Sequence, residues 1–277
     1  MVRSADPVVL VSAARTPMGS FQGALSALDA PSLGAVALRA AWARSGWQPD
    51  EGAAGQGEVL MGCVLPAGQG QAPTRQAALQ AGLPVGTPCT GVSKVCGSGM
   101  KAVMLAHDEL MAGSIEWALA GGMESMSNAP YLLPKARGGQ RLGHGQMLDH
   151  MFLDGLEDAY DAGTRGRLMG TFAEDCARRY AFSRAQQDDY ALASTRRAQQ
   201  AMHEGRFDWE LAPVSVPGRG GAATELRQDE PPWRVQPERV STLKPAFAPD
   251  GTVTAANASS ISDGAAALLL MRRSQAE

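Results

Sequence analysis

The sequence predicts an α/β fold in which helices alternate with the strands of a mostly parallel sheet. Short apolar runs, typical of buried strands, lie at residues 7–12, 58–65, 89–95 and 117–120. Longer segments whose apolar residues recur at helical spacing lie at residues 31–47, 72–81 and 97–111. Because strand-like and helical segments alternate along the chain, the order favours a sheet covered by helices.

Local sequence marks the ends of some of these elements. Pro73 lies near the start of segment 72–81 and Gly82 follows its end, an arrangement common in helices. Ser183 is expected to open a further long helix, because its side chain can cap the first turn and Gln186 completes a capping box. Gly205 is expected to end that helix.

The sequence changes character after Gly122, which predicts an inserted segment. Residues 128–170 are rich in glycine, methionine, histidine and charge, with little periodicity. Near the end of the chain we expect a short strand at 251–254 and a return to small apolar residues at 263–271. The expected organisation is a core at 1–122, an insertion at 123–249 and a return to the core at 250–277.

Composition argues against several classes of function. The 277 residues carry a net charge of -3, which gives no basic surface for nucleic acid. No block of lysine and arginine suggests an anionic membrane partner, and the longest apolar stretch, 265–271, is too short to span a bilayer. The start of the chain does not resemble a signal peptide, so we expect the cytoplasm or another reducing compartment.

The cysteines and histidines form neither a disulfide framework nor a pattern of metal ligands. The histidines, which do not cluster with the cysteines, are His107, His144, His150 and His203. Among the cysteines, we expect Cys63 to lie in the core, Cys176 to pack within a helix and Cys89 to be structural.

Cys96 is the one cysteine whose surroundings suggest chemistry. A strand is expected to end at Val95 and a helix to begin at about Gly97, which places Cys96 at a helix N-terminus. Unpaired N–H groups and the helix dipole favour the thiolate there and could bind an oxyanion, and Gly97 and Gly99 leave room for a substrate. From these residues alone, a buried packing role for Cys96 stays open, because free cysteine is among the most buried residue types.

The chain resembles the N-terminal half of the thiolase family, in order and over essentially its whole length. The matching segments are 15–23 (RTPMGSFQG), 93–101 (SKVCGSGMK), 121–127 (GGMESMS), 168–170 (LMG), 173–174 (AE), 243–247 (LKPAF), 251–259 (GTVTAANAS) and 262–266 (SDGAA). The resemblance implies a layered core with a mixed sheet and an inserted loop domain. It also implies an acyltransferase that moves acyl groups between CoA thioesters through Cys96, by thiolysis of 3-ketoacyl-CoA or by Claisen condensation.

The resemblance further implies that the loop domain binds CoA, with the CoA thioester as substrate and no separate cofactor. The matching positions are Leu156, Met169, Phe247, Ala255 and Ser259, with Arg234 as a candidate phosphate contact. On composition alone, Phe247 and Leu156 would belong to the core and Ser259 to a turn or cap.

Two motifs that the family uses in catalysis, Gly-His-Pro and Asn-Glu-Ala-Phe, do not occur in this sequence. The family carries them, with a second catalytic cysteine, in its C-terminal half, which we expect this chain to lack. General acid–base catalysis typically contributes ~10²–10⁴-fold, so the chain alone is expected to have little or no turnover. Leu168 replaces a histidine common in acetoacetyl-CoA thiolases, and 162–167 resembles an insertion, so the acyl-chain preference stays open.

Two alternatives accompany this interpretation. A decarboxylating ketoacyl synthase shares the fold, but its usual sequence around the cysteine differs. A non-catalytic half-thiolase that binds CoA or another subunit is compatible with the missing motifs. A half alone would expose apolar surface, so we expect a homo-oligomer, which in the family is a dimer or tetramer.

Overall fold

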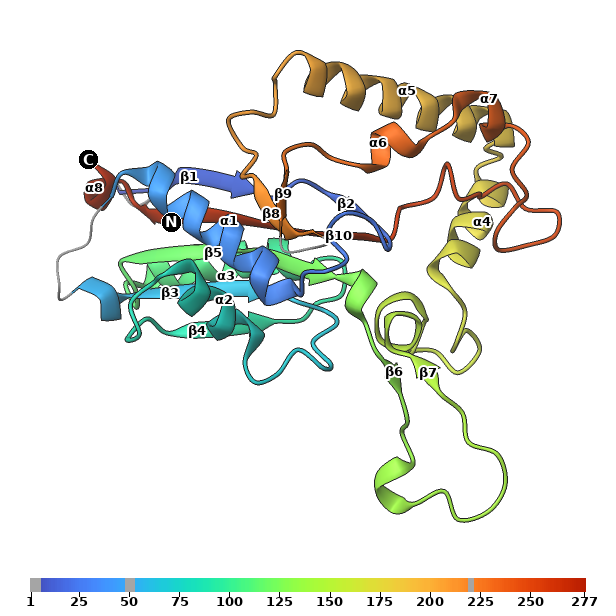
Figure 1. Ribbon diagram of the computed structural model, residues 1–277, viewed down its shortest axis with the longest axis horizontal. Helices are drawn as coiled ribbons and strands as arrows, with labels where there is room; N and C mark the ends of the chain where they lie inside the picture. Colours follow the sequence, from blue (N-terminus) through green and yellow to red (C-terminus); the bar gives the residue numbers. More distant parts are fainter. Residues whose placement is uncertain (1–5, 48–52, 219–221) are drawn as a thin grey trace. The chain divides into compact units, whose positions relative to one another are not determined.

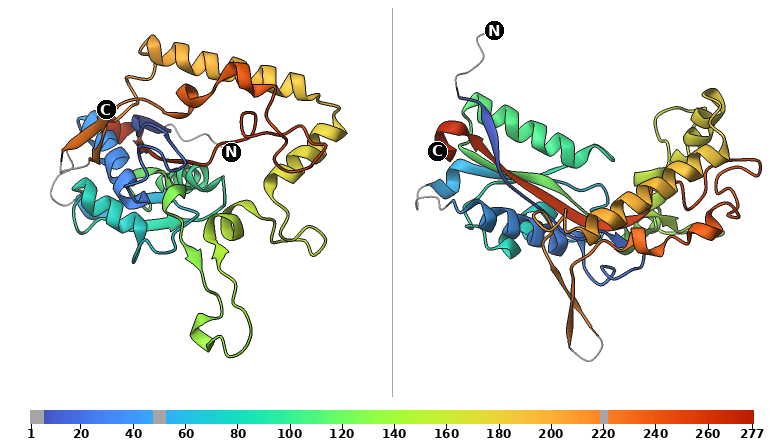
Figure 2. Two further views of the ribbon diagram at one scale, coloured as in Figure 1. Left: turned by 45° about the vertical axis from the view of Figure 1, so that its right-hand side comes forward. Right: turned by 90° about the horizontal axis from the view of Figure 1, so that it is seen from above.

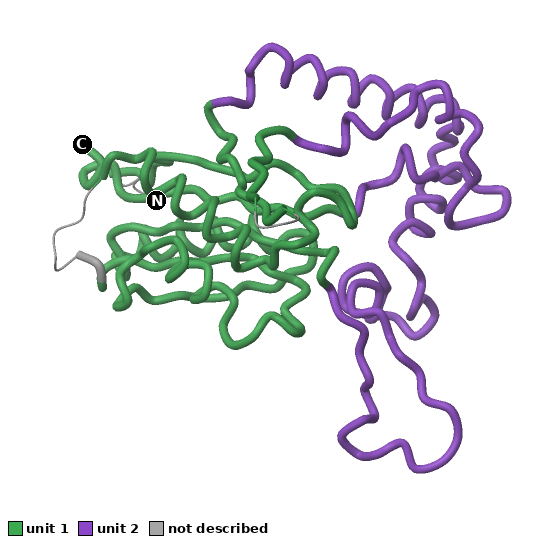
Figure 3. The backbone as a smooth tube through the Cα atoms, viewed as in Figure 1, with its two compact units in different colours: residues 1–128, 209–228, 262–277 green, residues 129–208, 229–261 purple. Residues whose placement is uncertain are grey.

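The computed structural model describes residues 6–47, 53–218 and 222–277 (Figure 1). The start of the chain, on which the signal-peptide expectation depends, lies largely outside them. The chain forms two compact units (Figure 3). Unit 1 comprises Met1–Asn128, Trp209–Gln228 and Ser262–Glu277, and unit 2 comprises Ala129–Asp208 and Asp229–Ile261. The domain boundaries expected from the sequence, at residues 122 and 249, stay a prediction.

Unit 1 is built on a six-stranded mixed sheet in the order β1-β10-β5-β3-β4, with β2 also paired to β10. Its strands are β1 (Val8–Arg15), β2 (Gly19–Ser20), β3 (Gly57–Gly62), β4 (Cys89–Val92), β5 (Trp117–Ser125) and β10 (Ser262–Arg272). Strand β3 runs parallel to β4 and β5, whereas β10 runs antiparallel to β1, β2 and β5. The mixed sheet implied by the resemblance is confirmed. The expectation of a mostly parallel sheet is wrong, because β10 lies between β1 and β5 and runs antiparallel to both.

Helices cover both faces of this sheet (Figure 2). Helices α1 (Ala30–Ser45) and α2 (Pro73–Ala81) pack on one face, with Val59, Leu119 and Leu269 in their core. Helix α3 (Ser98–Ala112) packs on the other, with Leu60, Ala120 and Leu270. The two core sets alternate along each strand, as expected when successive side chains point to opposite faces. A hairpin of β8 (Val214–Pro217) and β9 (Ala223–Leu226) and a short α8 (Arg273–Ala276) complete the unit.

Unit 2 consists of helices, a small hairpin and extended segments. Its elements are β6 (Tyr131–Leu132), β7 (Leu148–Asp149), α4 (Met169–Arg179), α5 (Arg184–His203), α6 (Pro231–Arg234) and α7 (Pro237–Val240), with a 3-10 helix at Ala136–Gly138 and a π-helix at Phe152–Leu156. The capping box of Ser183 and Gln186 at the start of α5 is confirmed. The strand expected at 251–254 is wrong, because this segment joins no sheet. No helix in the described part of the chain is long and apolar enough to cross a membrane.

Candidate active site

Cys96 lies on a tight turn between β4 and α3. The strand ends at Val92, earlier than expected, and the helix begins at Ser98. The Cys96 thiol forms no disulfide and is exposed. Val95 has a φ of 47°, in the left-handed region that β-branched residues rarely adopt. The structure therefore presents the thiol immediately before a helix N-terminus, from a strained turn.

Glycines allow the start of α3 to lie directly on the sheet. A Cβ added at Gly62, the last residue of β3, would lie 2.5 Å from the backbone nitrogen of Gly99. A Cβ at Gly122, in β5, would lie 3.3 Å from the Gly99 Cα. Since the first contact leaves no room for a methyl group and the second is tight, backbone packing against β3 and β5 fixes the position of the first turn of α3.

Cys96 lines a cavity of about 390 Å³ that belongs wholly to unit 1. The polar and charged residues of its lining are Arg15, Thr16, Cys96, Ser98, Glu124, Ser262 and Asp263. No histidine belongs to this lining within the described residues. His107 lies on α3, exposed, with Nδ1 3.2 Å from the Asp108 carboxylate, and His150 is a buried residue of unit 2 beside Asp154. The cavity thus contains a candidate nucleophile without an imidazole base.

The two carboxylates of the cavity lining are held by hydrogen bonds to neighbouring residues. Glu124 accepts from the backbone N–H groups of Val64, at 2.8 Å, and Leu65, at 3.0 Å. Asp263, which is 1% exposed, accepts from the N–H of Ser127 at 2.9 Å and from its hydroxyl at 2.6 Å. These bonds give both acids a structural role: they shape the loop after β3 and the entry of β10.

The other three cysteines occupy different environments. Burial, followed by the charge of Glu124, raises the pKa of Cys63 to about 12, and this residue lies in the core as expected. Burial also raises the pKa of Cys89. The packing role expected for Cys176 is wrong: its side chain is exposed, because α4 buries Glu174 and Ala177 instead.

All six candidate CoA contacts belong to unit 2. Leu156 and Phe247 are half-buried, and Met169, Arg234, Ala255 and Ser259 are exposed. Met169 begins α4, next to Gly170, where an added Cβ would lie 2.3 Å from the Phe247 ring. The structure therefore brings Phe247 to the start of α4. Arg234 forms an ion pair with Glu230 at 3.2 Å.

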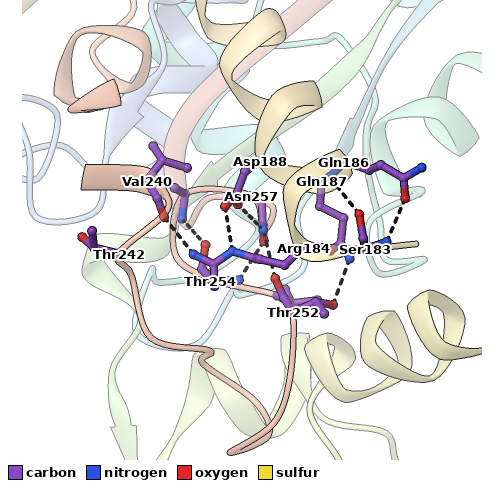
Figure 4. Close-up of polar contacts among 12 residues, drawn as sticks. Ser183, Arg184, Gln186, Gln187, Asp188, Val240, Thr242, Thr252, Thr254 and Asn257 are labelled. Carbon is purple, nitrogen blue, oxygen red and sulfur yellow. Dashed lines mark hydrogen bonds and ion pairs between the residues drawn. The ribbon is translucent and has the colours of Figure 1, made fainter. Parts of the chain in front are cut away.

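The segment that carries Ala255 and Ser259 is held by buried polar side chains of α4 and α5, and Figure 4 shows the contacts with α5. The Glu174 carboxylate, 3% exposed, accepts from the backbone N–H groups of Thr252 and Val253 at 2.7–2.9 Å. Burial alone would raise the pKa of Glu174, but these donors and the Thr252 hydroxyl outweigh it, so the pKa lies below its ordinary value. The local sequence does not indicate a role for Glu174, because its partners lie far away in the chain.

Helix α5 provides the second attachment of this segment. The Asp188 carboxylate accepts from the Asn257 amide at 2.9 Å and from the Arg184 guanidinium at 2.7 Å. Asn257 also bonds within its own segment, donating to the Thr252 carbonyl and accepting from the Thr254 N–H. An ordered loop results, although it contains no regular secondary structure.

Comparison with known proteins agrees with this architecture. Residues 8–274 match the family model described as "Thiolase, N-terminal domain". Acetyl-CoA acetyltransferase of Cupriavidus necator is 46% identical over 271 residues, which cover 98% of this chain and 67% of the relative. The protein of the same name from Pseudomonas aeruginosa is 47% identical over 272 residues, with the same coverage.

A plant relative gives the same result. Acetyl-CoA acetyltransferase 2 of Arabidopsis thaliana is 49% identical over 267 residues, which cover 95% of this chain and 64% of the relative. The chain thus spans about two thirds of the length of these relatives. Its match to the family model is nearly complete, and the chain belongs to the thiolase family, as its N-terminal domain.

Proposed function

We propose that Cys96 accepts an acyl group from an acyl-CoA thioester, as one half-reaction of an acetyl-CoA acetyltransferase. The observation that carries the proposal is the exposed Cys96 thiol, which lines a cavity immediately before the start of α3. The names of the relatives support acetyl-CoA as the donor. A thiolate suits this reaction because it is both a strong nucleophile and a fair leaving group.

The proposed step is a thioester exchange. The Cys96 sulfur attacks the carbonyl carbon of acyl-CoA, and the carbonyl oxygen becomes an oxyanion beside the N-terminus of α3, where the positive end of the helix dipole favours negative charge. The carbon–sulfur bond to CoA then breaks, CoA leaves as a thiolate, and the acyl group stays on Cys96. Condensation with a second acyl-CoA needs a base to remove an α-proton, and the lining includes no histidine among the described residues.

The proposal extends to the CoA site, the cellular compartment and the oligomeric state. We place CoA against Leu156, Met169, Phe247, Ala255 and Ser259, with Arg234 near a phosphate, and we assign no metal and no other cofactor. Four cysteines without disulfides fit the cytoplasm or another reducing compartment. Exposed methionines on α3, Met100 at 74% and Met104 at 51%, fit a homo-oligomer.

Mass spectrometry tests the proposal directly. The purified chain is incubated with acetyl-CoA, and the intact protein and its peptides are weighed. We expect one acetyl group on Cys96, lost in Cys96→Ser and kept in Cys176→Ser, which removes the other exposed thiol. CoA binding without acetylation would instead support a non-catalytic module. A chain that shows neither CoA binding nor acetylation would refute both the acyl-transfer proposal and the non-catalytic module.

A further inference from the structure

We propose that Ser98 is a positioning residue for Cys96, through a hydroxyl that closes the turn on which the nucleophile lies. Ser98 is 4% exposed and is the first residue of α3, but its side chain makes no cap of that helix. Its Oγ instead accepts from the Lys94 N–H at 2.8 Å and donates to the Val95 carbonyl at 2.6 Å. Both partners precede Cys96 in the chain.

Backbone hydrogen bonds also close this turn. The Gly97 N–H donates to the Lys94 carbonyl at 3.1 Å, and the Ser98 N–H donates to the Val95 carbonyl at 3.1 Å. Residues on both sides of Cys96 are therefore bonded to each other, and Cys96 lies at the centre of the closed turn. Two of the four bonds come from the Ser98 hydroxyl.

Ser98 can serve this role because its own position is fixed independently. A Cβ at Gly62 would lie 2.6 Å from the Ser98 carbonyl carbon and 2.7 Å from its Cβ, so β3 packs directly against this residue. The turn, by contrast, contains Val95 at a φ of 47°, a conformation unfavourable for a β-branched side chain. The hydroxyl transmits the fixed position of the helix to a turn that would otherwise relax.

The inference rests on the proposed function of Cys96, but its test reads the turn itself. The rate of Cys96 alkylation by iodoacetamide is measured by peptide mass spectrometry in the 277-residue chain. In Ser98→Ala we expect this rate to fall roughly tenfold, the loss for about two hydrogen bonds of ordinary strength. Cys176, exposed in unit 2, is the internal standard, and Ser114→Ala, an exposed serine just after the other end of α3, is the matched control.

A second substitution separates positioning from a general loss of structure. Glycine adopts positive φ without strain, so Val95→Gly combined with Ser98→Ala should recover at least a third of the lost rate. The double variant also provides the measurement if Ser98→Ala does not fold. An alkylation rate within twofold of the native chain in Ser98→Ala, or no recovery in the double variant, would overturn the proposal. If acetyl-CoA labels no variant while the alkylation pattern holds, the proposed function fails and the positioning role stands.

Discussion

The Asn257 side-chain amide donates a hydrogen bond to the buried Asp188 carboxylate at 2.9 Å, which joins the 251–259 segment to helix α5. The same amide bonds the Thr252 carbonyl at 3.0 Å, and its oxygen accepts from the Thr254 N–H at 2.7 Å. One side chain thus holds the segment both internally and against the helix. A binding segment ordered in advance loses less entropy when its ligand binds.

Replacing Asn257 with alanine should therefore weaken CoA binding by roughly tenfold and destabilise the chain by about 1–3 kcal/mol, because the Thr254 N–H loses its acceptor and Asp188 loses one of its two donors. Titration calorimetry with CoA and urea unfolding measure the two effects. Gln200→Ala removes an exposed amide from α5 and should change neither. An unchanged dissociation constant in a folded Asn257→Ala chain would remove this segment from the CoA site.

The Glu174 carboxylate should make stability depend on acid pH. Its pKa is lowered from the ordinary 4.5, mainly because N–H donors of Val253 and Thr252 outweigh burial. The contribution of this carboxylate to the free energy of unfolding is therefore complete above pH 4.5. It is lost as the pH falls through the lower pKa that Glu174 has in the folded state. Glu174→Gln should lower the free energy of unfolding at pH 7 by about 1–3 kcal/mol and reduce its loss below pH 4.5.

Urea unfolding between pH 7 and pH 3 tests this expectation. Glu238→Gln, at an exposed position on α7, is the matched control and should follow the native curve. A Glu174→Gln curve parallel to that of the native chain over the whole range would contradict the role assigned to the carboxylate.

Cys63 should be inert in the folded chain. Burial and the nearby Glu124 charge raise its pKa from 9.0 to about 12, so almost none of it is thiolate at pH 8. Iodoacetamide should modify Cys96 and Cys176 first, and Cys63 only after urea unfolding. Because the raised pKa favours the protonated thiol, stability should also fall as the pH rises from 9 towards 12. Equal labelling of Cys63 and Cys96 at pH 8 would show that this part of the core opens readily.

Local sequence patterns predicted the main helices and strands of the core, but not the contacts that organise them. Residues 31–47 and 97–111 form α1 and α3 with ends shifted by one or two residues, and the Ser183 capping box is present. The segment 251–254 was misread as a strand because its apolar and β-branched residues fit one. The N–H groups of Thr252 and Val253 bond instead to Glu174, 78 and 79 residues earlier. Such a contact leaves no periodic trace in the sequence.

At the candidate nucleophile, too, the sequence predicted the local structure but not the tertiary contacts. The strand-to-helix pattern around Cys96 predicted a thiol just before a helix, which the structure confirms. The exposure of this thiol is a finding of the structure, because the residues alone left a buried packing role open. The strained Val95 and the two bonds of Ser98 could not be predicted, because they depend on how closely α3 approaches β3. The family resemblance identified the CoA contacts only as positions, and their role stays a prediction.

The substitution Gly62→Ala should test most directly whether packing of α3 on the sheet positions Cys96. An alanine Cβ there would lie 2.5 Å from the Gly99 nitrogen and 2.7 Å from the Ser98 Cβ, so the first turn of α3 must move. We expect Gly62→Ala to destabilise the chain by about 1–3 kcal/mol, the usual cost of overpacking, and to slow Cys96 alkylation in the chain that stays folded. Gly86→Ala, where nothing lies within 4 Å of the added Cβ, is the control and should do neither. If Gly62→Ala lost stability but kept the native alkylation rate, the turn would be independent of the helix position. Loss of both would show that the sheet positions Cys96 through the first turn of α3.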